Sequence, residues 1–275
     1  MGENSKIAWT DVTWNIATGC SKVDEDCKFC YMYRESKEGE KYSPSIVTRT
    51  KKAFNLPLRL KSPSKVFACS LTDFFHEGCD AYRAEAWEII KKCPQHIFQI
   101  LTKRPERIKD CLPVDWGTVY ENVWMGTSVG NQKSIHRIGQ LMQVPAKIRF
   151  LSIEPMHGEI DLEYPIDIYP DGPPMCCSGH QCGCMGQPTE PPIGWGLNWI
   201  IVGGESGNET GKYRYRPCKQ EWIENIVNFG KSYNIPIFVK QMGTHLAKEL
   251  GMVDKTGSDF EEFPESLKVR EFPKS

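Results

Sequence analysis

The sequence has no run of about 18 apolar residues, so it predicts no membrane-spanning helix. Its first ten residues, MGENSKIAWT, contain no apolar signal segment. Together with twelve cysteines in 275 residues, this argues against a secreted protein built on disulfides and favours a reducing cytosol. Positive charge is not in excess either, since the net charge is -1. A protein that grips duplex nucleic acid normally carries a basic face, so nucleic acid is the less favoured partner.

What is present is ordinary for a globular protein, with 40% hydrophobic and 25% charged residues. A chain of 275 residues is slightly longer than a typical (β/α) barrel and long enough to bury one sizeable core. We therefore expect one domain over residues 1–275.

Short β-rich runs alternate with helical patterns along the chain, and each run ends in polar or glycine-rich residues. The expected strands lie within residues 7–17, 65–71, 96–101, 123–126, 148–153, 198–202 and 235–239, and the expected helices within 81–92, 134–142 and 220–232. This order predicts parallel βαβ units and an α/β fold, a full or partial TIM-like barrel. The alternative is an open doubly wound sheet, but the late GGESG stretch lacks the G-x-G-x-x-G fingerprint.

A cysteine-rich loop follows the first expected strand, with Cys20, Cys27 and Cys30 in C-x6-C-x2-C spacing. Three nearby thiolates can hold an iron–sulfur cluster whose fourth iron stays open to another ligand. A zinc site, which usually needs a fourth protein ligand, and three unrelated buried thiols are the alternatives. The aromatic residues Phe29 and Tyr31 flank the last cysteine and favour the cluster, since they could shield a cofactor.

With Phe29 just before its last cysteine, the loop resembles that of radical S-adenosylmethionine (radical SAM) enzymes, although these usually have three residues between the first two cysteines. A longer resemblance is to the phage-type Gp37/Gp68 family of radical SAM proteins. It is carried, in order, by AWTDVTWNIATGC, SLTDFFHE, FQILTKRPERI, VWMGTSVGNQ, RFLSIEP, WIIVGGESG and FVKQMG. Within that family, the small and neutral chain is most similar to queuine lyases.

The resemblance implies a barrel of the radical SAM type with a [4Fe-4S] cluster on Cys20, Cys27 and Cys30. It also implies S-adenosyl-L-methionine on the open iron, a flavodoxin- or ferredoxin-type electron donor and formation of a 5′-deoxyadenosyl radical. Residues just past the strands of such a barrel gather on one rim. The residues expected to contact the cofactor are Phe29, Tyr31, Ser70, Thr72, Asp73, Lys103, Ser128 and Glu154.

The late rim residues Glu205, Ser206, Lys240 and Gln241 are expected to bind substrate. Glu205 could accept hydrogen bonds from a guanine-like edge, with a structural Glu205–Lys240 salt bridge as the competing account. The favoured substrate is a small nucleobase, queuine, cleaved to the 7-aminomethyl-7-deazaguanine base. A radical SAM enzyme that modifies or repairs nucleic acid is the alternative, and a zinc-binding module without catalysis is the third hypothesis.

A cysteine- and proline-rich insertion at about residues 160–196 interrupts the pattern of strands and helices. Its candidate ligands for zinc or an auxiliary cluster are Cys176, Cys177, His180, Cys182 and Cys184. Their spacing differs from the C-x2-C … C-x2-C pattern of a zinc ribbon, so a lid without metal is the alternative. The remaining thiols are interpreted as buried or half-buried packing residues: Cys69, Cys79, Cys93, Cys111 and Cys218.

Overall fold

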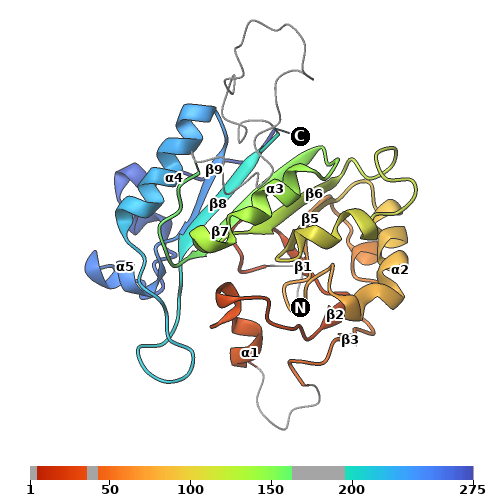
Figure 1. Ribbon diagram of the computed structural model, residues 1–275, viewed down its shortest axis with the longest axis horizontal. Coiled ribbons are helices and arrows are strands. Elements are labelled where there is room, and N and C mark those ends of the chain that lie inside the picture. Colours follow the sequence, from red (N-terminus) through yellow and green to blue (C-terminus); the bar gives the residue numbers. More distant parts are fainter. Residues whose placement is uncertain (1–4, 36–42, 163–195, 275) are drawn as a thin grey trace, which may run out of the picture.

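The computed structural model describes residues 5–35, 43–162 and 196–274, and these contain a curled sheet of seven parallel strands. The strands are β1 (Val12–Trp14), β4 (Lys65–Ala68), β5 (Ile97–Thr102), β6 (Val123–Ser128), β7 (Ile148–Met156), β8 (Trp199–Gly204) and β9 (Ile237–Gln241). They pair in that order, with β1 and β9 as the two edges of the sheet (Figure 1). The sheet is therefore a half-barrel, which confirms the predicted α/β fold as a partial TIM-like barrel.

The first strand is shorter than predicted. Only Val12–Trp14 joins the main sheet, whereas β2 (Ala17–Thr18) pairs antiparallel with β3 (Thr48–Arg49) in a small second sheet. The chain leaves the main sheet at Asn15, whose side-chain oxygen accepts a hydrogen bond of 2.7 Å from the Leu71 amide. That side-chain bond could not be read from the alternation of apolar and polar residues.

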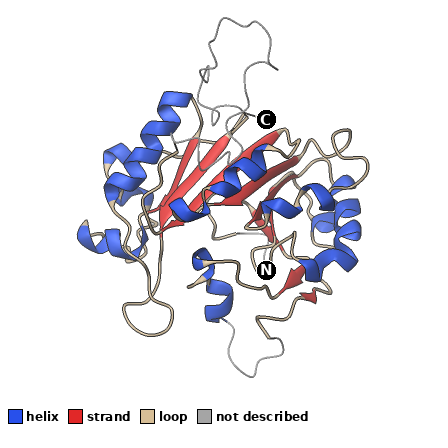
Figure 2. Ribbon diagram, viewed as in Figure 1, coloured by secondary structure: helices blue, strands red, loops and turns tan. Residues whose placement is uncertain are grey.

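The three predicted helices are present as α2 (Asp80–Lys91), α3 (His136–Met142) and α4 (Gln220–Tyr233). The shorter α1 (Tyr31–Glu35) follows the cysteine loop, and α5 (Gly243–Glu249) follows β9. Figure 2 shows the strands in the middle of the molecule with helices around them. Single 3-10 turns occur at Glu25–Cys27, Pro57–Arg59, Glu77–Cys79, Pro105–Arg107, Lys109–Cys111, Gln132–Ser134, Phe260–Glu262 and Glu265–Leu267.

The two faces of the sheet bury different side chains because successive strand residues point to opposite faces. One face packs in the main core with the helices and carries the aliphatic residues Val66, Ile100, Met125, Leu151 and Val202. The other holds an aromatic cluster near the amino ends of the strands: Trp9, Phe67, Trp124, Phe150, Trp199 and Phe238. On this second face the same alternation leads from Phe150 to Ser152 and Glu154 and from Phe238 to Lys240. Polar side chains thus follow the aromatic cluster toward the carboxyl ends.

Helix α4 shows how closely the outer layer packs. Its apolar residues Ile223, Ile226, Val227 and Phe229 are buried. An added Cβ at Gly230 would lie 2.3 Å from the Ile237 side chain of β9, so the helix approaches the sheet only because this position is a glycine. The helix ends at Asn234, which adopts a left-handed conformation.

The insertion residues Cys176, Cys177, His180, Cys182 and Cys184 lie outside the described residues. Elsewhere the predicted packing thiols are confirmed: Cys69, Cys79, Cys93 and Cys218 are buried, Cys111 is half-buried, and all are free thiols. Among the described helices, none is both long and apolar enough to span a membrane.

Candidate active site

A cavity of about 300 Å³ lies at the carboxyl ends of the strands, against the cysteine loop. This volume is at the lower end of the range for small-molecule sites. Every residue predicted for the site within the described ranges lines it: Cys20, Cys27, Phe29, Cys30, Tyr31, Ser70, Thr72, Asp73, Lys103, Ser128, Glu154, Glu205, Ser206, Lys240 and Gln241. The structure therefore brings the predicted set together, while the role of each residue stays a prediction.

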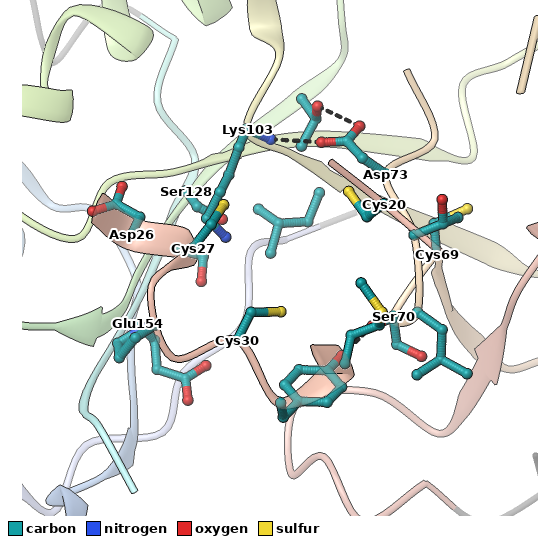
Figure 3. A pocket seen from close by; sticks show the side chains of 18 of the residues that line it. Cys20, Asp26, Cys27, Cys30, Cys69, Ser70, Asp73, Lys103, Ser128 and Glu154 are labelled. Atoms are coloured by element: carbon teal, nitrogen blue, oxygen red, sulfur yellow. Dashed lines mark hydrogen bonds between the residues drawn. The ribbon is translucent and has the colours of Figure 1, made fainter. Parts of the chain in front are cut away.

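Figure 3 shows Cys20, Cys27 and Cys30 around the same space. The loop enters at Gly19, where φ is +93° and an added Cβ would lie 2.2 Å from the Ile46 carbonyl oxygen, so only glycine fits. The loop closes on itself because the Tyr33 hydroxyl donates to the Cys20 carbonyl. Local backbone geometry thus turns three separated cysteines toward one cavity.

The described side chains offer no ready-made site for a single metal ion. Within the described residues, no three His, Cys, Asp or Glu side chains are close enough to hold one ion together. Burial raises the pKa of Cys20 to about 11, with the Asp73 carboxylate adding to the shift and Arg104 opposing it. Iron would favour the thiolate.

Arg104 anchors the Cys20 end of the loop. Its guanidinium Nη1 lies 3.8 Å from the Cys20 sulfur and 3.2 Å from an Asp73 oxygen. Its Nη2 donates to the Ser21 carbonyl oxygen at 2.9 Å and to the Ser21 hydroxyl at 2.8 Å. A buried cation therefore fixes the backbone at Cys20 and also touches its sulfur.

Asp73 joins the ends of β4 and β5. Besides Arg104, its carboxylate accepts from the Thr102 hydroxyl at 2.7 Å and the Lys103 amide at 3.0 Å (Figure 3). It also accepts from the Phe75 amide at 2.9 Å. The predicted role of Asp73 as acceptor for the methionyl ammonium stays a prediction. Its carboxylate already has four donors, so its evident task is to hold the rim together.

Asp26 anchors the Cys27 end of the loop, at 5% exposure. Its carboxylate contacts one charged group, one imidazole and two amides: Arg137 Nη1 at 2.8 Å, His157 Nε2 at 2.7 Å, Asn131 Nδ2 at 2.9 Å and the Gly130 amide at 3.3 Å. Burial works to raise the pKa of Asp26, but the His157 hydrogen bond and the Arg137 charge hold it well below its usual range. This end of the loop is thus tied to residues that follow β6 and β7.

Asn15 completes the rim at the first strand. Its side-chain amide donates to the Ser70 hydroxyl at 3.0 Å, and the Ser70 carbonyl accepts from the Tyr31 hydroxyl. The segment after β4 is therefore bonded both to β1 and to α1. This arrangement keeps Ser70 and Tyr31, two of the predicted cofactor contacts, next to each other.

On the far side of the cavity, the salt bridges differ from the Glu205–Lys240 pair considered in the sequence analysis. Lys240 pairs with Glu154 at 2.5 Å, and the Glu205 carboxylate accepts from the Arg216 side chain at 2.7 and 2.8 Å. The Glu205–Lys240 salt bridge is therefore wrong. Gln241 donates its amide to the Gly204 carbonyl at 2.8 Å.

Several residues that organise the site escaped the sequence analysis: Asn15, Asp26, Arg104, Arg137, His157 and Arg216. Arg104 had a usable signal, because it lies directly past a predicted strand beside Lys103. Asp26 and His157 gave none, since they are 131 positions apart and meet only in the fold.

A comparison with curated proteins finds no match. Among solved structures, a mutant form of spore photoproduct lyase matches with a TM-score of 0.41 and 14% identity over 56% of this chain. The match spans 48% of that chain, about half its length, and is too distant to carry an argument. A family model described as "Protein of unknown function (DUF5131)" matches residues 4–266, nearly the whole sequence. The chain belongs to that family.

Proposed function

We propose that this protein is a radical SAM enzyme whose cluster is held by Cys20, Cys27 and Cys30 and whose cofactor occupies the adjoining cavity. The observation that carries the proposal is that all three cysteines line one cavity at the carboxyl ends of a parallel half-barrel. Barrel enzymes place their chemistry at that rim. When bound, the cluster supplies the electron that cleaves S-adenosyl-L-methionine.

The chain's own residues supply binding and orientation. Lys103 is half-buried and lines the cavity. Its charge acts on the Asp26 carboxylate, but its ammonium forms no salt bridge among the residues described, so it suits the methionyl carboxylate. Ser70, Thr72 and Ser128 offer hydroxyls, and Glu154 offers a carboxylate held by Lys240. Phe29 and Tyr31 line the cavity together with Cys30, and their rings would help to keep water from a bound cofactor. A flavodoxin- or ferredoxin-type donor would deliver the electron.

Two substrate classes fit this chemistry. A free deazaguanine such as queuine agrees with the net charge of -1. However, the recognition of its edge by Glu205 loses support, because both Glu205 oxygens accept from Arg216. Modification or repair of a nucleic acid is the second candidate, and a basic, aromatic loop beside the cavity favours it.

The test is anaerobic reconstitution with iron and sulfide, followed by iron analysis and detection of 5′-deoxyadenosine. Wild-type protein should bind about four irons per chain and cleave the cofactor under reduction. Alanine at Cys20, Cys27 or Cys30 should abolish both properties, while Cys111→Ala, a half-buried thiol outside the cavity, should retain both. A Cys20/Cys27/Cys30 triple variant that kept the iron spectrum of the wild type would refute the proposal.

A further inference from the structure

A loop between β8 and α4, residues 207–216, directly follows the cavity-lining residues Glu205 and Ser206 and is bonded to the cysteine loop (Figure 1). The Tyr213 hydroxyl donates to the Tyr33 carbonyl at 2.9 Å, and Arg216 Nη1 donates to the Glu25 carbonyl at 2.7 Å. The Arg216 guanidinium also lies 5.5 Å from the centre of the Phe29 ring. Three contacts thus hold this loop next to the proposed cluster ligands.

The loop carries alternating cations and aromatic rings, in the sequence Lys212-Tyr213-Arg214-Tyr215-Arg216. A turn shapes it, with the Asn208 amide donating to the Tyr213 carbonyl at 3.2 Å and a bridge between Asn208 and Arg214. The Tyr215 hydroxyl lies 3.2 Å from a Glu209 oxygen, so both tyrosine rings are tethered at their tips. Their rings are half-exposed, whereas Lys212 and Arg214 are exposed.

The cysteine loop adds further cations to the same rim. Lys22 lies 5.0 Å from the centre of the Tyr33 ring and Lys28 lies 5.5 Å from that of Phe29. Within the described ranges, no salt bridge joins a carboxylate to Lys22, Lys28, Lys212 or Arg214.

The nearby acids do not cancel this charge. Asp24 pairs with Arg137, and Glu209 pairs with Lys248 at 2.5 Å. Glu25 is exposed on the same loop and offsets one charge, so three of the four positive charges of Lys22, Lys28, Lys212 and Arg214 remain. Elsewhere Arg49 is neutralised in place by a salt bridge to Glu85 at 2.7 Å. A local positive surface therefore exists within a chain whose net charge is -1.

We infer that this rim binds single-stranded nucleic acid, with phosphates on the four unpaired cations and bases on the neighbouring rings. Aromatic platforms interleaved with cations are the usual means of binding single strands. A base within a duplex cannot reach the bottom of a cavity, so the strand must present an unstacked base. A free neutral base has no phosphate and would gain nothing from these cations. The inference rests on the proposed function, because the bound strand would supply its substrate.

The test is fluorescence anisotropy of the reconstituted protein with labelled single-stranded DNA and RNA oligonucleotides over a range of salt concentrations. Each phosphate contact on a single strand contributes about 0.7 to the slope of log affinity against log salt. The double variant Lys212→Ala/Arg214→Ala should bind more weakly and should lower that slope by about 1.4. The DNA and RNA arms identify which strand is preferred.

The matched control is Lys92→Ala/Lys231→Ala, which removes two exposed cations that precede β5 and β9, near the amino ends of the strands, and that form no salt bridge within the described ranges. Its affinity and slope should equal those of the wild type. Circular dichroism verifies that both variants fold. The variant Lys22→Ala/Lys28→Ala, on the cysteine-loop side of the rim, should also bind oligonucleotides more weakly and show a lower salt slope.

Absence of strand binding, or equal slopes for wild type and the Lys212/Arg214 variant, would overturn the inference. Cofactor cleavage measured without any oligonucleotide separates the two proposals. If cleavage persists without strand binding, only the inference about strand binding is wrong, and titration with free queuine is the next experiment. If strands bind but no iron is retained, the proposed function falls.

Discussion

The two ends of the cysteine loop are anchored by different means. At the Cys20 end, the Arg104 guanidinium bonds to the backbone and lies 3.8 Å from the sulfur itself. At the Cys27 end, the preceding Asp26 takes the anchoring contacts, and in the described part of the chain no hydrogen bond reaches the Cys27 sulfur. Arg104 therefore fixes the conformation of the loop and also contacts a ligand sulfur, whereas Asp26 fixes the conformation of the loop without contacting one.

Because of this difference, the stability of the apoprotein and the electronic properties of a bound cluster should depend on different ends of the loop. The Cys27 anchor should contribute more to the stability of the apoprotein, because both side chains of its Asp26–Arg137 pair are 2% exposed, against 8% for both side chains of the Asp73–Arg104 pair. The Cys20 anchor should govern the electronic properties of a bound cluster, because hydrogen bonds to ligand sulfurs help to set reduction potentials. Variants at each end can test whether the two properties divide in this way.

The largest effect is expected for Asp26→Ala. The change leaves the Arg137 guanidinium, whose side chain is 2% exposed, without its buried partner. Breaking a buried pair costs about 3–5 kcal/mol of unfolding free energy. Urea denaturation of the apoprotein measures this loss.

Asp24→Ala is the control for that variant, because Asp24 pairs with the same Arg137 but is 36% exposed. It should cost less than about 1 kcal/mol. Equal losses for the two variants would show that burial of Asp26 does not dominate this end of the loop.

Low pH should weaken the same contacts of Asp26 and so lower the stability of the protein. The pKa of Asp26 is held below its usual range by His157 and Arg137 against the effect of burial, so its ionised form stabilises the fold. That stabilisation is complete above the unfolded pKa of about 3.9 and is lost as the pH falls below it. Asp26→Asn should therefore flatten the acid side of the curve of stability against pH. A curve that keeps the wild-type slope would argue against this assignment.

A smaller effect on stability, with a distinct effect on the cluster, is expected for Arg104→Gln. Asp73 keeps three neutral donors, so the unfolding free energy should fall by about 1–2 kcal/mol. Loss of the positive donor near the Cys20 sulfur should lower the reduction potential of the reconstituted cluster, measured by an EPR-monitored redox titration.

Arg107→Gln serves as the comparison for Arg104. Arg107 lies in the turn that follows Arg104 and pairs with Glu77 and Asp80, which are largely exposed. Its replacement should leave the potential unchanged. A shift of the same size in both variants would mean that overall charge, and not the contact at Cys20, sets the potential.

Much of this arrangement was predictable from the sequence. The strands could be placed because apolar runs ended abruptly, and the site residues because parallel strands bring their carboxyl ends to one rim. The pairing of side chains was not predictable. Glu205 binds Arg216 in the following loop, not Lys240, because that loop folds back toward Glu205 in a conformation that no periodic pattern encodes. The Asp26–His157 contact likewise depends on two loops that meet only in three dimensions.

A smaller effect than that of Asp26→Ala or Arg104→Gln is expected for Asp254→Asn, which tests whether burial or the number of donors makes Asp26 important. The Asp254 carboxylate accepts from the Ser258 amide and hydroxyl at 2.6 Å and from the Thr256 hydroxyl at 2.9 Å. Hydrogen bonds, that from the Ser258 side chain first, hold its pKa below the usual range although it is only half-buried. The turn supports Gly257, whose carbonyl accepts from the Met242 amide just past β9 at 2.7 Å.

Because water can replace donors at such an accessible site, Asp254→Asn should lower the unfolding free energy by only about 1 kcal/mol. Urea denaturation beside Asp26→Ala gives the direct comparison. If Asp254→Asn cost as much as Asp26→Ala, the number of donors would explain both carboxylates. The burial of the Asp26 charge would then not explain why the Cys27 end of the loop depends on this residue.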